Sequence, residues 1–135
     1  MKSGKVRFGY LHYAFLGPES ERAAEASECA AEQGAFWPYH DRLYERQVGE
    51  NRGAFSQDNL ERFAVELGLD GQAFNACLIS GKYAATVRAD TAAGESLGVK
   101  GTPAFLVNGR PLVGALPFEA FRQAIETELA ATNRK

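Results

Sequence analysis

Residues 98–114, GVKGTPAFLVNGRPLVG, have the pattern of a loop followed by a β-hairpin. The loop ends in Thr102-Pro103, and the apolar runs AFLV and RPLVG flank Asn108-Gly109. Asn-Gly between two apolar runs is the strongest local hairpin signal, because a type I′ turn needs positive φ at both central residues. Pro111 has no N–H to donate, so we expect it at a non-bonded or edge position of the second strand.

Helical patterns occupy most of the chain before this hairpin. Apolar residues recur at helical spacing, and they are bounded by capping residues and glycines. We expect helices at 18–33, from Pro38 to about 47, after Ser56, after Asp70, and at 82–97. Pro117 then opens a last helix, because proline is favoured in the first turn.

Residues 5–13, KVRFGYLHY, alternate between two faces and predict a β-strand. Two strands alone are marginally stable, so we expect this strand to join the hairpin in one sheet. The chain has no internal repeat and no linker composition, so residues 1–135 are predicted to form a single domain.

The composition excludes several classes of partner. The chain has a formal net charge of −2 and no basic run, which argues against nucleic acid and against anionic membrane surfaces. Its apolar stretches are far shorter than a membrane span. Charges interrupt the apolar residues at the start, so we identify no signal peptide in these residues. Two cysteines do not fix the redox compartment.

The order strand, helices, hairpin, helix resembles the DsbA-like thiol–disulfide oxidoreductases. Three stretches in order carry the resemblance: ECAAEQGAFWPYHDRLYERQ (28–47), FNACLISGKYAATVRAD (74–90) and LGVKGTPAFLVNGRPLVGALPFEAFRQAI (97–125). The resemblance implies an α/β, thioredoxin-like fold with a helical insertion at about 18–97. The thioredoxin part would comprise 5–13 and 98–132.

The resemblance also defines what these residues lack. Chains of that family begin with a strand and a helix that opens on Cys-x-x-Cys, and this sequence starts where their second strand starts. We therefore expect an N-terminally truncated fold without the first βα unit, and no catalytic residue among the 135. The resemblance assigns Gly101, Thr102 and Pro103 to the loop that faces the substrate chain, with a cis peptide bond before Pro103. It implies no cofactor.

Cys29 and Cys77 lie 48 positions apart on apolar helix stripes, so they are no local redox motif. Two reduced core cysteines, a structural disulfide and a redox-active pair all remain open. Some relatives in the resembled family carry a structural pair at matching places, which favours the disulfide.

Neither histidine is predicted to be catalytic. We interpret His40, on an aromatic helix face, as a hydrogen-bonded core residue, and His12 has no Cys, Asp or second His nearby in sequence. No spacing of residues predicts a metal site. A run of acidic residues is interpreted as a solvated helix face: Glu19, Glu21, Glu25, Glu28 and Glu32.

The resemblance implies an oxidoreductase that oxidises or isomerises protein disulfides, with protein or peptide thiols as substrates and usually outside the cytoplasm. Because the dithiol is absent, we expect this chain to be inactive in exchange. The alternative is a non-catalytic thioredoxin-like binding module that forms homo-oligomers through open sheet edges. A weaker alternative is a relative of the kappa-class glutathione transferases, whose catalytic serine lies in the region absent here.

Overall fold

A computed structural model describes residues 4–132. The chain divides into two compact units. We call Leu11–Ala93 the helical unit, and Met1–Tyr10 together with Gly94–Lys135 the hairpin unit. The helical insertion predicted at about 18–97 corresponds in position to the helical unit, and its predicted ends differ from those of the unit by a few residues.

The helical unit contains α1 (Pro18–Ala31), α2 (Phe36–Arg46), α3 (Gln57–Glu66), α4 (Gly71–Ser80) and most of α5 (Ala84–Ser96). Local sequence signals explain several of these boundaries. Pro18 occupies the first turn of α1, and the Asp70 side chain accepts a hydrogen bond from Ala73 N at 3.0 Å to cap α4. Gly81 ends α4 at φ 63°, a conformation that favours glycine.

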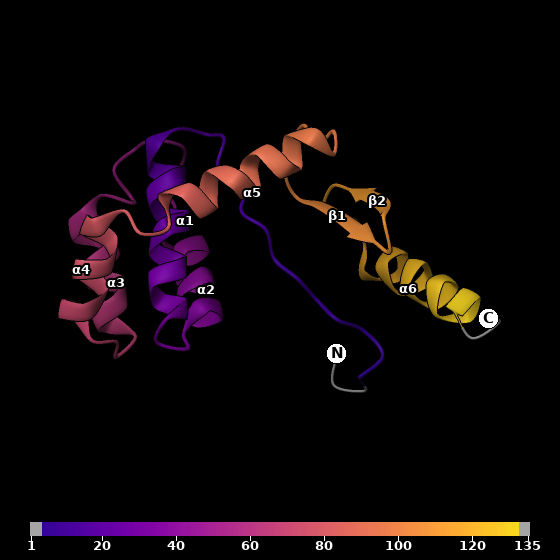
Figure 1. Ribbon diagram of the computed structural model, residues 1–135, viewed down its shortest axis with the longest axis horizontal. Helices are drawn as coiled ribbons and strands as arrows, with labels where there is room; N and C mark the ends of the chain where they lie inside the picture. The colour runs from indigo at the N-terminus through magenta and orange to yellow at the C-terminus, as the bar shows by residue number, and fades with distance from the viewer. Residues whose placement is uncertain (1–3, 133–135) are drawn as a thin grey trace. The chain divides into compact units, whose positions relative to one another are not determined.

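The core of the helical unit lies where α1 meets α2, α3 and α4 (Figure 1). Alanines at 23, 26 and 30 give α1 a face of small side chains within this core. The largest fully buried side chains of the core are Tyr39, Phe63, Phe74, Leu60 and Leu78. The fully buried Tyr39 donates its hydroxyl hydrogen to Leu60 O at 2.9 Å, which joins α2 to α3.

The acidic run on α1 differs from the predicted solvated face. Glu25 is buried, and Arg22 lies 3.4 Å from its carboxylate. Glu19 accepts hydrogen bonds from the backbone N–H groups of Gly53 and Phe55, so it anchors the loop before α3. The interpretation from sequence was wrong for these two glutamates. Glu25 is buried on α1 beside Arg22, three positions earlier, and the partners of Glu19 lie 34 and 36 positions further along the chain.

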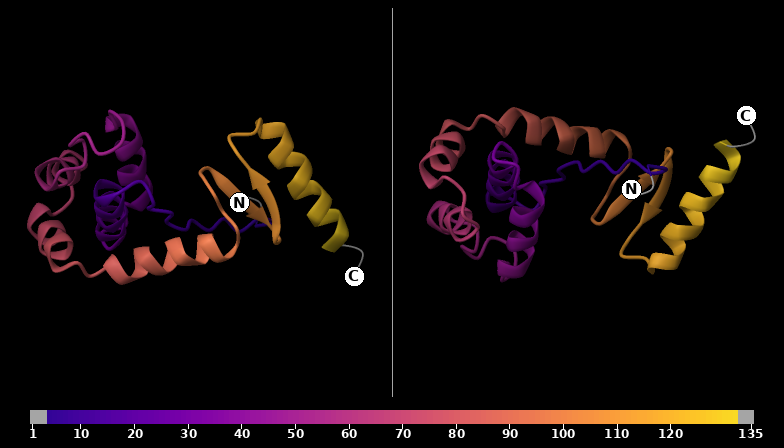
Figure 2. Two further views of the ribbon diagram at one scale, coloured as in Figure 1. Left: turned by 90° about the horizontal axis from the view of Figure 1, so that it is seen from above. Right: turned by 90° about the horizontal axis from the view of Figure 1, so that it is seen from below.

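The hairpin unit consists mainly of β1 (Ala104–Val107), β2 (Arg110–Val113) and α6 (Phe118–Thr132). The two strands pair antiparallel with Phe105 opposite Leu112. Asn108 and Gly109 both have positive φ, as the predicted type I′ turn requires. Both views in Figure 2 show α6 beside the hairpin, where the Phe105 and Phe121 rings pack edge to face at 4.8 Å.

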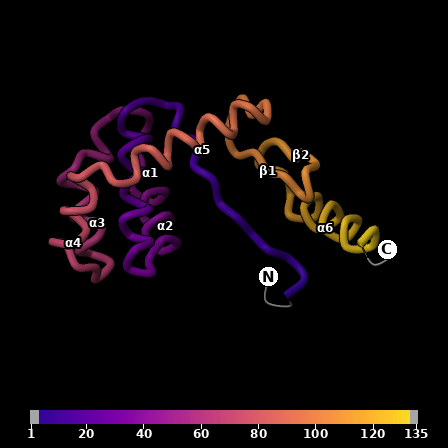
Figure 3. Tube along the Cα trace, viewed as in Figure 1, coloured from indigo at the N-terminus to yellow at the C-terminus, as the bar shows by residue number. Residues whose placement is uncertain are grey.

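The predicted strand at residues 5–13 is not formed. Residues 6–15 have no regular secondary structure and form the extended indigo segment before α1 in Figure 3. The N–H groups of His12 and Ala14 donate instead to side chains of α5, Asp90 Oδ2 at 3.2 Å and Thr91 Oγ1 at 3.1 Å. Alternation predicts an extended backbone, but a strand also needs a partner ladder. The sheet in residues 4–132 therefore has two strands.

No described residue of the hairpin unit is buried, whereas the helical unit contains a continuous apolar core. Two strands and one helix cannot enclose a side chain on all sides. No helix within residues 4–132 has the length and apolarity needed to cross a membrane.

Candidate functional site

The loop that connects α5 to β1 carries the three predicted substrate-contacting residues. The Thr102–Pro103 peptide bond is cis. Thr102 and Pro103 are exposed and Gly101 is partly exposed. Gly114 N donates to Pro103 O at 2.8 Å, which extends the hairpin pairing to the proline. The loop therefore presents the backbone of Thr102 at the open end of the hairpin.

Glu128 of α6 fixes the other end of the hairpin. One carboxylate oxygen lies 2.9 Å from Arg110 Nε, and the other accepts a hydrogen bond from Asn108 Nδ2 at 3.2 Å. The Glu128 side chain is only 16% exposed, so these contacts are partly shielded from water. Together with the Phe105–Phe121 contact, they hold the hairpin against α6.

Cys29 of α1 and Cys77 of α4 form a disulfide with an S–S distance of 2.06 Å and a Cα–Cα distance of 5.9 Å. Both cysteines are buried within the core of the helical unit. They are the only two cysteines of the sequence, so no free thiol remains. The pair therefore has the surroundings of a structural crosslink between two helices.

Sequence reasoning missed the environment of His12. The residue is only 5% exposed, and its Nε2 lies 2.8 Å from Glu28 Oε1. Its ring also meets Phe36 edge-on at 6.1 Å between centroids. Glu28 lies 16 positions further along the chain, so no local motif could have indicated this pair.

His40 is hydrogen-bonded as predicted, but it is partly exposed and not a core residue, so that part of the interpretation was wrong. Its Nδ1 donates to the carboxylate of Asp41 at 3.0 Å, and its ring lies between those of Trp37 and Tyr44. The two histidines do not come together with the cysteines. Within residues 4–132, no group of three or more His, Cys, Asp or Glu side chains is arranged to hold a metal ion.

One further polar cluster links α1 to the start of α5. Glu32 accepts hydrogen bonds from Lys82 Nζ and from the Tyr83 hydroxyl, the latter at 2.7 Å. The hydrogen bond from Lys82 lowers the pKa of Glu32, and the same contact raises the pKa of Lys82. Lys82 is exposed and the cluster lies at the surface, so we interpret it as a surface contact between elements.

These features define a class of protein. A cis-proline loop that leads into a hairpin, a C-terminal helix packed on that hairpin, and a disulfide-linked helical unit earlier in the chain together characterise a thioredoxin-like domain with a helical insertion. The family model for the DsbA-like thioredoxin domain matches residues 6–126. The chain belongs to this family.

Several curated proteins are similar to the chain over most of its length. It is 38% identical over 128 residues to the Na⁺/H⁺ antiporter NhaA 3 of Salinispora tropica, which covers 93% of the chain and 19% of that protein. It is 28% identical over 130 residues to the probable disulfide bond formation protein D of Bacillus anthracis, which covers 93% of the chain and 59% of that protein. The chain thus spans about a fifth of one relative and three-fifths of the other.

A solved structure supports the fold. A thioredoxin-like oxidoreductase from Silicibacter pomeroyi DSS-3 aligns with a TM-score of 0.69, over 88% of this chain and 66% of that one, at 23% identity. The predicted fold class, a thioredoxin-like fold with a helical insertion, is confirmed.

Proposed function

We propose that these residues form the substrate-facing part of a DsbA-type thiol–disulfide oxidoreductase that acts on protein thiols. The family match supports this proposal most strongly, because it spans both units of the chain. In the proposal, the backbone of Gly101 and Thr102 contacts an extended segment of the substrate, and Pro103 keeps the loop in position. The exposure of Thr102 and Pro103 is consistent with this role.

The same proposal holds that these 135 residues do not exchange disulfides by themselves. Exchange needs a thiolate that attacks a disulfide sulfur and a second thiol that resolves the mixed disulfide. The cysteines of the chain are joined to each other and buried. Neither lies at a helix N-terminus, where the helix dipole would favour a thiolate.

Reduction of insulin by dithiothreitol, followed as turbidity, tests the absence of exchange. We expect the chain to leave the rate at that of the blank, and Cys29→Ala with Cys77→Ala to do the same. A rate above the blank that the double variant abolishes would assign the exchange to this pair and contradict the proposal.

Substrate contact is tested separately, with a reduced cysteine-containing peptide added to the ¹⁵N-labelled chain. We expect amide shifts confined to residues 99–104 and weaker binding by Thr102→Arg, which places a long side chain in the loop. Thr127→Arg, at another exposed threonine, on α6, is the matched control. Equal effects of the two variants would contradict the assignment of the loop.

The second candidate function is a non-catalytic binding module that forms homo-oligomers. The exposed apolar side chains of the hairpin favour it: Leu106 is 49% exposed and Val113 is 70% exposed. Each strand has a single paired neighbour within residues 4–132, and open apolar strand edges pair readily. The antiporter relatives, in which the similar region is a small part of a longer protein, are consistent with an attached module.

Light scattering during gel filtration tests this second candidate. Association through β1 predicts a dimer or larger species that Leu106→Lys converts to monomer, because a buried, unpaired lysine is costly. A chain that stays monomeric at millimolar concentration would exclude it.

A further inference from the structure

One face of α2 carries a row of aromatic rings that lie outside the apolar core of the helical unit. The centroids of Trp37 and His40 are 5.4 Å apart, and those of His40 and Tyr44 are 4.8 Å apart. Trp37 is 47% exposed and Tyr44 is 62% exposed. We call Trp37, His40, Asp41 and Tyr44 the aromatic face of α2. Their spacing of three and four residues places them on one side of the helix.

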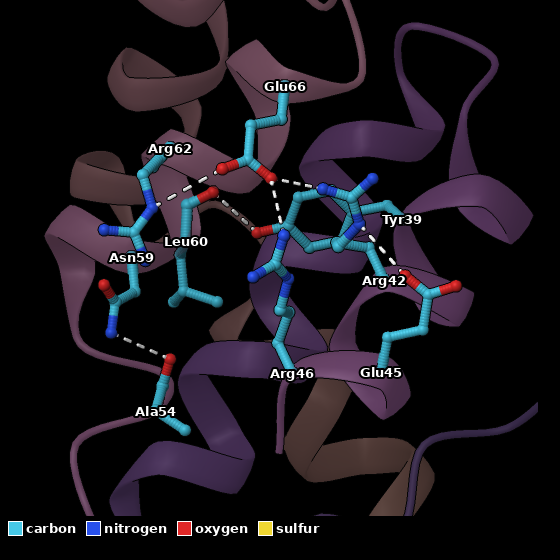
Figure 4. Close-up of polar contacts among 9 residues, drawn as sticks. All are labelled: Tyr39, Arg42, Glu45, Arg46, Ala54, Asn59, Leu60, Arg62 and Glu66. Carbon is cyan, nitrogen blue, oxygen red and sulfur yellow. Dashed lines mark hydrogen bonds and ion pairs between the residues drawn. The ribbon is translucent and has the colours of Figure 1, made fainter. Parts of the chain in front are cut away.

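Other side chains of α2 pack in the core or pair with carboxylates. Tyr39 and Leu43 are buried in the core. Arg42 and Arg46 reach Glu66 of α3, and Figure 4 shows both guanidinium groups directed at that carboxylate. Arg42 also pairs with Glu45 at 3.3 Å. The arginines of α2 are therefore held by carboxylates instead of standing over the rings.

The charge beside the rings is negative. The Asp41 side chain is 72% exposed, and its contact within the unit is the hydrogen bond from His40. The helical unit as a whole has 13 acidic and 7 basic residues, a formal charge of −6. Exposed rings flanked by a carboxylate attract cations, since the ring face is electron-rich and the carboxylate adds a direct charge interaction. This complementarity selects a basic partner over an acidic or purely apolar one.

We propose that the aromatic face of α2 binds a basic extended segment of a partner polypeptide, with arginine or lysine side chains on the rings of Trp37 and Tyr44 and beside Asp41. Two helical turns separate the outer rings, about 10 Å along the axis. A polyproline II segment advances about 9 Å in three residues and returns to the same side. The matching ligand therefore carries basic residues three positions apart. This inference does not depend on the proposed function, whose substrate contact is the loop before β1 in the hairpin unit.

Trp37 is the single tryptophan of the chain, so its fluorescence reports on the aromatic face directly. The peptide to titrate is acetyl-Arg-Pro-Pro-Arg-Pro-Pro-Arg-amide, with analogues in which Gln or Glu replaces every Arg. We expect a saturable change with the Arg peptide and at least about tenfold weaker responses with both analogues, because cation–π and carboxylate contacts both require the positive charge. Equal responses to the three peptides, or none, would overturn the proposal.

Two variants and a matched control locate the binding. Asp41→Asn and Tyr44→Leu should each weaken the binding of the Arg peptide about threefold or more, because each removes one such contact. Glu50→Gln removes the same charge from an exposed loop position and should leave the affinity unchanged. Equal weakening by Asp41→Asn and Glu50→Gln would show only a general charge effect and would contradict the site. Circular dichroism of each variant verifies the fold.

A second copy of the chain is the competing occupant. In that case the Trp37 emission would change with protein concentration and would not respond to the Arg peptide. This result would overturn the proposal and assign the aromatic face to self-association.

Discussion

The hydroxyl group of Tyr39 joins two helices through one buried hydrogen bond, to Leu60 O at 2.9 Å. Removing it with Tyr39→Phe should lower the free energy of unfolding by about 1 kcal/mol at pH 7, the usual net value of such a bond. Urea denaturation followed by circular dichroism measures this loss. An unchanged midpoint would show that the hydroxyl contributes nothing to the contact between α2 and α3.

The same hydroxyl should make stability depend on alkaline pH. Burial raises the pKa of Tyr39, so the folded state keeps its proton at a pH where the unfolded chain loses it. Stability from this residue is therefore complete below about pH 10, the value for an unfolded tyrosine, and decreases above it. Between pH 9 and 11 the midpoint of Tyr39→Phe should fall less steeply than that of the parent chain. Parallel slopes would contradict this assignment.

The Cys29–Cys77 disulfide should account for a large part of the stability of the helical unit. It closes a loop of 48 residues, and the chain-entropy account gives about 4 kcal/mol for a loop of this length. Cys29→Ala with Cys77→Ala should lower the free energy of unfolding by about that amount, measured by urea denaturation. Dithiothreitol should destabilise the parent chain similarly and leave the double variant unaffected. A double variant as stable as the parent would mean that the crosslink is dispensable.

At the scale of elements, α5 holds the extended segment before α1 through two side chains. Asp90 and Thr91 accept hydrogen bonds from the N–H groups of His12 and Ala14. Asp90→Ala with Thr91→Val should speed hydrogen exchange at these two amides several-fold, as expected for the loss of bonds of ordinary strength. Arg88→Ala, at an exposed position of the same helix, is the control. Equal exchange in both variants would show that water already satisfies these amides.

Sequence reasoning succeeded for elements whose signals are local. The Asn108-Gly109 turn, the Asp70 cap and the Gly81 terminus each depend on the backbone preference of one or two residues. It failed where the partner lies far away in the chain. The alternation at 5–13 predicts an extended backbone correctly, but it does not reveal that Asp90 and Thr91 accept its hydrogen bonds. The His12–Glu28 pair of the candidate site was missed for the same reason.

At the scale of the whole molecule, the two units differ in how much apolar surface they bury. The helical unit encloses a core that includes Tyr39, Phe63 and Phe74, while the hairpin unit has no buried residue within the described chain. Resistance to local opening depends on buried apolar contacts as well as on hydrogen bonds. If backbone hydrogen bonds alone determined this resistance, the amides of strands and helices would be equally protected from exchange. Comparing the two units therefore tests the contribution of buried apolar contacts.

We therefore expect native-state hydrogen exchange to separate the units. The amides of α1 and α3 should exchange through global unfolding of the helical unit, with free energies that depend on urea and fall in the Cys29→Ala, Cys77→Ala double variant. The amides of β1 and β2 should exchange faster, with little dependence on urea, because opening the hairpin exposes little additional apolar surface. If the strands were as protected as α1, the hairpin would have to be covered by something beyond its contact with α6. Repeating the measurement over a range of protein concentrations would then show whether a second copy provides that cover.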